Sequence, residues 1–77
     1  MNLSEPFSAR MLLAQNLRHL RERSELSVSD LAERTGISAK RLGGIENGRI
    51  DAHLDDLDRL ASGVGVSLAA LFKAEGF

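Results

Sequence analysis

Apolar residues recur at helical spacing along most of the chain, and no stretch shows the strict alternation of a strand. Ser8 is a candidate N-cap for a first helix that ends at about residue 23. One face of this helix carries Leu13, Leu17 and Leu20. Two short helices are predicted within residues 27–49, a fourth ends at about residue 62, and a fifth follows Ser67. The pattern predicts an all-α domain of five short helices.

Residues 27–49 are the most informative segment. Ser27 can cap one helix and Ser38 a second helix over residues 39–47, while Gly36 between them permits a backbone with positive φ. Gly48 is a stop signal. The positions expected to be apolar or buried are Val28, Leu31, Ala32, Ile37, Leu42 and Ile45. Two helices joined by a glycine-containing turn form a helix-turn-helix, whose second helix enters the major groove of DNA.

The remaining elements complete the predicted core. The fourth helix is expected to be capped by His53 or Asp51, and Gly63 and Gly65 are expected to break the chain after it. Its inner face is expected to carry Leu54, Leu57, Leu60 and Ala61. The short fifth helix carries Leu68, Leu71 and Phe72.

The absence of cysteine excludes a disulfide framework and a thiolate metal site, and the low net charge by itself argues against nucleic-acid binding, whereas the distribution of charge supports it. The chain has 77 residues, no cysteine and a net charge of −1. Residues 10–49 hold eight basic and five acidic residues, whereas residues 50–77 hold two basic and five acidic ones. The helix-turn-helix half is therefore the basic half. His19 and His53 lie on different predicted helices, which favours surface or capping roles over a metal site. No cofactor and no small-molecule ligand are expected.

The chain ends suggest no targeting or membrane function. Residues 1–7 show no period and are expected to form a flexible segment before one domain over residues 8–77. No run approaches the roughly 18 apolar residues of a membrane span, and the N-terminus lacks the pattern of a signal peptide. A cytoplasmic location is expected.

Four blocks of sequence together resemble the lambda-repressor/Cro-like (XRE-type) helix-turn-helix DNA-binding family. The blocks are LRHLRERSELS, DLAERTGIS, IENGR and LDDLDRLASGVGVSLAALF. The resemblance implies a compact five-helix domain that regulates transcription, commonly as a homodimer on a palindromic operator in double-stranded DNA. Compact members include controller proteins of restriction–modification systems and prophage regulators.

The resemblance also implies roles for individual residues. Base contacts are expected from the recognition helix, at Ala39, Lys40, Arg41, Gly43 and Gly44. Phosphate contacts are expected from Ser27, Val28, Asn47 and Arg49. The family further pairs Arg21 with Glu46 inside the fold, and we interpret this pair as structural.

The residues themselves support part of this assignment. Lys40 and Arg41 follow the Ser38 cap at the end of the helix that reaches the groove floor, although a solvated charged face is the alternative. An arginine there can bond both O6 and N7 of guanine. The Ser38 hydroxyl or nearby N–H groups can face a phosphate in addition to capping. Arg49 can contact a phosphate or serve as a dipole partner for the recognition helix.

Four positions depart from the family pattern. Val28 replaces a glutamine that commonly opens the second helix, Ala52 a loop proline, and Glu25 the glycine that usually ends the first helix. If Glu25 keeps a left-handed backbone, strain of roughly 1 kcal/mol is expected. The fourth departure is the pair Gly43 and Gly44. We interpret this pair as permitting close approach to DNA, so that Gly44→Ala should raise thermal stability and weaken operator binding.

A homodimer is expected because one recognition helix contacts few base pairs. The interface candidates, besides part of the fourth helix, are Leu68, Leu71, Phe72 and Phe77. The alternative is a protein-interaction module, antitoxin-like or a scaffold, that retains the helix-turn-helix fold. Low net charge, Val28 and the twin glycines favour that alternative. An enzyme is not expected, because a chain of this size has little room for a catalytic cleft.

Overall fold

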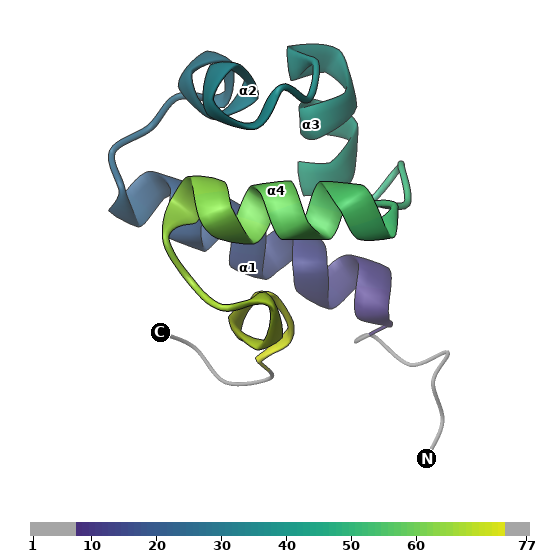
Figure 1. Ribbon diagram of the computed structural model, residues 1–77. Helices are drawn as coiled ribbons and strands as arrows, with labels where there is room; N and C mark the ends of the chain where they lie inside the picture. Colours follow the sequence, from purple (N-terminus) through teal and green to yellow (C-terminus); the bar gives the residue numbers. More distant parts are fainter. Residues whose placement is uncertain (1–7, 74–77) are drawn as a thin grey trace.

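The computed structural model describes residues 8–73 and contains four α-helices followed by a short 3₁₀ helix (Figure 1). The elements are α1 (Ala9–Arg23), α2 (Val28–Thr35), α3 (Ala39–Glu46), α4 (Leu54–Val64) and η1 (Leu68–Phe72). The predicted all-α fold with five short helical elements is therefore confirmed. The expected flexible segment 1–7 and the expected interface residue Phe77 lie outside the described residues.

One apolar core lies between the helices. Its fully buried side chains are Leu17, Leu31, Leu42, Ile45, Leu60 and Leu71. α1 packs against α3, α4 and η1, whereas α2 packs against α3 and α4 (Figure 1). The helix-turn-helix of α2 and α3 is thus supported from beneath by α1 and α4.

Two leucines differ from the sequence expectation. Leu54, expected on the inner face of α4, is 79% exposed. It occupies the first position of α4 and lies at the edge of the face centred on Leu60 and Val64, so its side chain projects past the core. Leu71, expected at a dimer interface, is 0% exposed and belongs to the core. It therefore cannot contribute to an interface while η1 stays packed.

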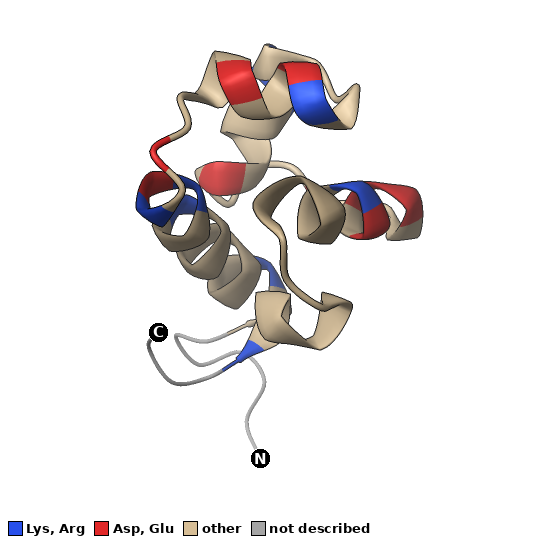
Figure 2. Cartoon of the chain, turned by 60° about the vertical axis from the view of Figure 1, so that its left-hand side comes forward, with Lys and Arg blue, Asp and Glu red and all other residues tan. Residues whose placement is uncertain are grey.

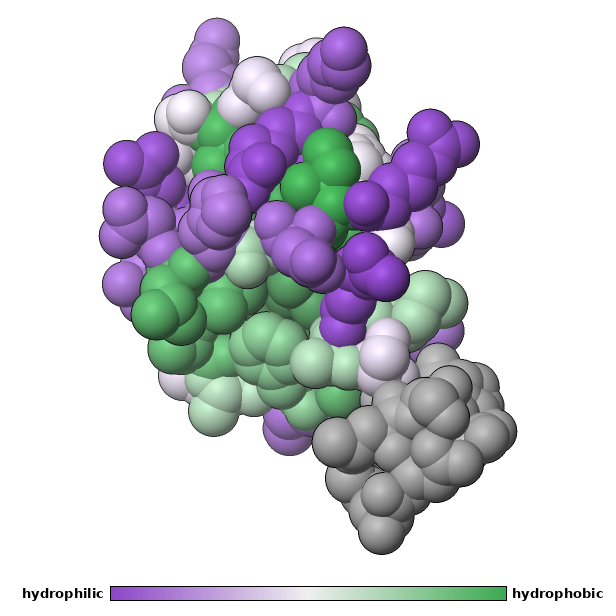
Figure 3. All heavy atoms as spheres, turned by 90° about the vertical axis from the view of Figure 1, so that its right-hand side faces the viewer, coloured by the Kyte–Doolittle hydropathy of each residue, from purple (hydrophilic) through white to green (hydrophobic). Residues whose placement is uncertain are grey.

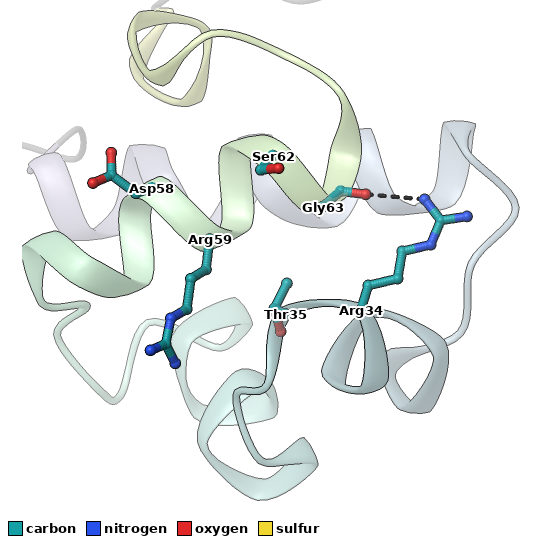
Figure 4. A pocket seen from close by; sticks show the side chains of 6 residues that line it. All are labelled: Arg34, Thr35, Asp58, Arg59, Ser62 and Gly63. Atoms are coloured by element: carbon teal, nitrogen blue, oxygen red, sulfur yellow. Dashed lines mark hydrogen bonds between the residues drawn. The ribbon is translucent and has the colours of Figure 1, made fainter.

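Gly63 does not end α4, as the sequence suggested, but lies within it, one residue before its end. A Cβ at this position would lie 2.8 Å from Cγ2 of Thr35 and 3.0 Å from Cδ1 of Leu31. The absence of a side chain therefore lets α4 approach α2 closely. The carbonyl of Gly63 also accepts a hydrogen bond from Nη1 of Arg34 at 3.1 Å (Figure 4). The side chains of Leu31 and Thr35 thus pack directly on the backbone of α4 at Gly63, and one hydrogen bond from Arg34 also joins the two helices.

A shallow hollow of about 420 Å³ lies beside this contact, between α2 and α4. Its lining residues, drawn in Figure 4, are Arg34, Thr35, Asp58, Arg59, Ser62 and Gly63. The guanidinium of Arg59 reaches toward the turn between α2 and α3, where one of its nitrogens would lie 3.8 Å from a Cβ at Gly36. The long arginine stems therefore cover the seam between the two helices.

Three helices end in the same Schellman motif. In α1, the N–H of Leu26 donates to the carbonyl of Arg21 and the N–H of Glu25 to that of Glu22. The equivalent left-handed positions after α3 and α4 are glycines, Gly48 and Gly65, with φ of 74° at both. Glu25 has φ of 58° and is the non-glycine residue with positive φ in the described part of the chain. The expected left-handed backbone at Glu25 is therefore present.

A buried amide, not anticipated from the sequence, fastens η1 to α1. Asn16 is 8% exposed. Its Nδ2 donates to the carbonyl oxygens of Leu71 at 2.9 Å and Lys73 at 2.8 Å. These bonds satisfy carbonyls at the end of η1 that have no partner within the helix.

Candidate nucleic-acid interface

The N-terminus of α2 is closed by a reciprocal capping box. Oγ of Ser27 accepts from the N–H of Asp30 at 3.0 Å, and Oδ2 of Asp30 accepts from the N–H of Ser27 at 3.0 Å. The hydrogen bonds from the backbone and hydroxyl of Ser27 lower the pKa of Asp30. Asp30 therefore remains ionised at neutral pH, at the helix end where a phosphate contact was expected.

Helix α3 is capped by Ser38, as predicted, since its Oγ accepts from the N–H of Arg41 at 3.1 Å. The inner side of the helix buries Leu42, Ile45 and Glu46. Ser38, Ala39 and Lys40 are exposed. Lys40, Gly43 and Asn47 follow at intervals of three and four residues and therefore share the opposite side. We call this side, with Ala39, the open face of α3.

The two glycines of α3 have different surroundings. A Cβ at Gly43 would meet nothing within 4 Å, so Gly43 belongs to the open face. A Cβ at Gly44 would lie 2.7 Å from Cγ1 of Ile50 and 3.3 Å from its Cβ. The Gly44 carbonyl also accepts from the N–H groups of Arg49 and Ile50. The close neighbour of Gly44 is thus the protein's own loop, and on this geometry we expect Gly44→Ala to lower stability instead of raising it.

Arg41 is held by the protein instead of projecting freely. Its Nη2 donates to Oδ2 of Asp56 at 2.6 Å and to the carbonyl of Asp51 at 3.3 Å. The side chains of Arg41 and Asp56 are 31% and 11% exposed. Both Lys40 and Arg41 were expected to contact bases, but the structure turns Arg41 toward a carboxylate that α4 brings to the flank of α3.

The Asp56 carboxylate has a second anchor. Its Oδ2 also accepts from the N–H of His53, the N-cap of α4, at 2.8 Å. Desolvation raises the pKa of Asp56, but the hydrogen bonds from Arg41 and from the His53 backbone outweigh it, and the net pKa is lowered. Asp56 is therefore a charged residue that ties the start of α4 to the first turn of α3.

The predicted pair between Arg21 and Glu46 is present below α3. Nε and Nη2 of Arg21 donate to the two carboxylate oxygens of Glu46 at 2.7 Å and 3.1 Å, and Nη1 donates to the Leu26 carbonyl at 2.7 Å. The hydrogen bond with Glu46 raises the pKa of Arg21, against the opposing effect of desolvation. This bidentate pair fixes the end of α3 on α1.

A further cation of α1, which the sequence did not single out, contacts the end of α3. Arg18 donates through Nη2 to Oδ1 of Asn47 at 3.1 Å, and its Nε lies 3.8 Å from Oε1 of Glu46. The spacing of Arg18 and Arg21 at i and i+3 on one helix was the available signal. Asn47 and Arg49 are exposed, whereas Val28 is half-buried and packs against the core.

Charge is mixed along the helices. Figure 2 shows acidic and basic residues together on both α2 and α4. α4 carries three aspartates and one arginine, and α2 carries Asp30 and Glu33 beside Arg34. Among the described residues, no group of three or more His, Cys, Asp or Glu side chains is placed to hold a metal ion. No described helix is both long and apolar enough to cross a membrane.

α2 ends in a turn that contains Gly36, and α3 follows with Ser38 as its N-cap and one side exposed. Two helices joined in this way define a helix-turn-helix DNA-binding domain. Residues 12–72 match the family described as "Helix-turn-helix domain", and the chain belongs to this family. It is a family of DNA-binding regulators and not of enzymes. No curated protein matches the chain.

Three solved structures are similar over most of the chain. The restriction-modification controller protein C.AhdI from Aeromonas hydrophila is 29% identical with a TM-score of 0.81, covering 86% of this chain and 100% of that one. An HTH_3 family transcriptional regulator from Vibrio cholerae is 34% identical with a TM-score of 0.79, covering 83% and 36%. The hypothetical transcription factor NHTF from Neisseria is 26% identical with a TM-score of 0.81, covering 84% and 75%. The resemblance to XRE-type regulators is confirmed.

Proposed function

We propose that this protein is a sequence-specific transcriptional regulator in the cytoplasm that inserts the open face of α3 into the major groove of double-stranded DNA. The observation that carries the proposal is the exposed first turn of α3, with Lys40 beside Ala39 and with open space at Gly43. The helix is fixed on α1 by the Arg21–Glu46 pair, so its first turn is presented on a rigid support.

The roles of the interface residues follow from their placement. Lys40 is proposed to donate to a guanine edge, and Ala39 and Gly43 to allow the helix to approach the base pairs closely. Phosphate contacts are proposed for the exposed residues around the two helices, namely Ser27, Ser38, Asn47 and Arg49. Val28 contributes to that set only through its backbone, because its side chain packs against the core.

A homodimer is proposed to place two copies of α3 on a palindromic operator, in half-sites about one helical turn apart. Leu54 on α4 and Leu68 on η1 are 79% and 44% exposed, and Phe72 at the end of η1 is half-buried. Apolar surface covers much of the lower part of the face shown in Figure 3. Water-exposed leucines on α4 and η1 support a contact with a second copy.

In-vitro selection of bound DNA from a random pool tests the proposal that this protein is a sequence-specific regulator. Enrichment of one palindromic consensus is expected, with binding that weakens steeply as salt rises. Lys40→Gln should lower affinity for the selected site about tenfold or more, as loss of a base contact does. Lys73→Gln is the control, because it removes the same charge from the residue after η1, an element that packs on α1 and α4.

The alternative is a protein-interaction module that retains the fold, and the ionised Asp30 at the α2 N-terminus favours it because it opposes a nearby phosphate. This alternative would be supported if the protein enriched no DNA sequence and bound another protein with an affinity that does not change with salt.

A further inference from the structure

The two cations in the first turn of α3 are presented in different ways. Lys40 is exposed on the open face, whereas the guanidinium of Arg41 lies against the start of α4. The first turn is the part of a recognition helix that reaches base edges. An arginine at this place would normally be the stronger reader of guanine, since it can donate two hydrogen bonds to one base. Its retention by the protein therefore bears on which base the interface selects.

Asp56, the residue that holds Arg41, is itself held in place by a hydrogen bond from a backbone N–H and is not a flexible surface side chain. Asp56 is buried and serves as the third residue of the α4 capping box. The same Oδ2 accepts from the His53 N–H and from Arg41. A short, charge-assisted bond to an oxygen held in this way has both strength and direction. The Asp51 carbonyl offers Arg41 a further acceptor on the same side.

We infer that Asp56 is a positioning residue that sets the base preference of the interface, by keeping Arg41 on the protein side while Lys40 reads the groove. The inference rests on the proposed function. Its consequence is that specificity is governed in part from α4, an element that does not enter the groove.

The test is in-vitro selection with Asp56→Asn. Asparagine keeps the size of the side chain and an oxygen for the His53 N–H, but it removes the charge that holds Arg41. The variant should acquire a guanine preference of about tenfold at one position per half-site, within the range of one arginine–guanine contact. The double variant Arg41→Gln with Asp56→Asn should lose that preference and return to the wild-type consensus.

The matched control is Asp55→Asn. Asp55 is exposed in the same first turn of α4, so its removal changes net charge equally and leaves the Arg41 contact in place. Any general rise in DNA affinity from lost negative charge should appear in both single variants. The new guanine preference should appear only in Asp56→Asn.

The single variant Arg41→Gln supplies a measurement that does not depend on the folding of Asp56→Asn. It should select the wild-type consensus, because Arg41 is already withheld. Loss of a guanine from the consensus of Arg41→Gln would overturn the inference, as would an unchanged consensus in an Asp56→Asn protein that melts cooperatively. A wild-type chain that selects no sequence would contradict the proposed function and this inference together, whereas the first two results contradict only the inference.

Discussion

Glu25 adopts the left-handed backbone that ends α1, although this conformation is unfavourable for a residue with a side chain. Its backbone is left-handed, with φ of 58°, at the position where α3 and α4 end with Gly48 and Gly65. A Cβ in this conformation costs roughly 1–2 kcal/mol, and the hydrogen bonds of the Schellman motif offset it. Negative charge at the C-terminal end of a helix is also unfavourable.

Glu25→Gly should therefore stabilise the domain by about 1 kcal/mol, or roughly 4–8 °C in a chain of this size. Thermal unfolding followed by circular dichroism measures the change. Glu25→Ala separates strain from charge, since it removes the carboxylate but keeps the Cβ. An equal gain in both variants would assign the effect to charge and not to backbone strain.

Gly43 and Gly44 offer a second comparison between neighbouring residues. Gly43→Ala adds a methyl group in open space and should raise stability by up to about 1 kcal/mol through helix propensity. Gly44→Ala must displace the half-buried Ile50, and overpacking of this kind costs roughly 1–3 kcal/mol. The second variant should melt below the wild type and the first above it. The reverse order of melting temperatures would show that the loop after α3 yields easily.

At the scale of elements, α3 is held at both ends by ion pairs that face different helices. Arg21 on α1 binds its last residue, Glu46, and Asp56 on α4 binds its first turn through Arg41. The side chains of Arg21 and Glu46 are 13% and 4% exposed. Removal of one partner from such a pair leaves a charge with poor access to water.

Glu46→Ala should lower the free energy of unfolding by roughly 3–5 kcal/mol, a large part of the stability of a small domain. Denaturant titration at neutral pH measures this loss. Glu33→Ala, which removes an exposed carboxylate from α2, should change stability by no more than about 0.5 kcal/mol. Similar midpoints for the two variants would show that the buried pair contributes no more than a surface charge.

The elements that the sequence predicted correctly are those set by local signals. Ser27 and Ser38 cap α2 and α3 because their hydroxyls lie three residues before an N–H that needs an acceptor. Contacts between elements that are distant in the sequence could not be predicted from such local signals. The retention of Arg41 depends on how α4 crosses α3, and its partner Asp56 lies fifteen residues away. The contact of Gly44 with Ile50 likewise depends on the path of the loop.

The apolar residues show the same limit. Periodicity identified most of the core but placed Leu54 inside and Leu71 at an interface, whereas Leu54 is 79% exposed and Leu71 is fully buried. Helical spacing gives the side of a helix on which a residue lies. Helical spacing does not show how far the neighbouring elements reach along that side. At the ends of short helices, this reach decides whether a side chain is buried.

At the scale of the whole molecule, the proposed dimer makes the exposed leucine of α4 an experimental target. Leu54→Ser should shift the protein toward monomer in analytical ultracentrifugation and reduce affinity for a palindromic site, while the melting temperature at low concentration stays near that of the wild type. Met11→Ser is a control of similar chemistry, since Met11 is 42% exposed on α1. If neither substitution changes the molar mass measured in solution, the contact between copies does not involve Leu54.

The close seating of α4 on α2 at Gly63 has a consequence for the DNA that such a dimer can use. Because Leu31 and Thr35 of α2 pack directly against α4 at Gly63, we expect the helix-turn-helix and α4, the helix proposed to join the copies, to move as one rigid unit. One base pair added between half-sites turns one of them by about 35° around the duplex axis. A protein without a hinge cannot follow that turn, so operators for this regulator should tolerate altered bases at the centre but not an altered length.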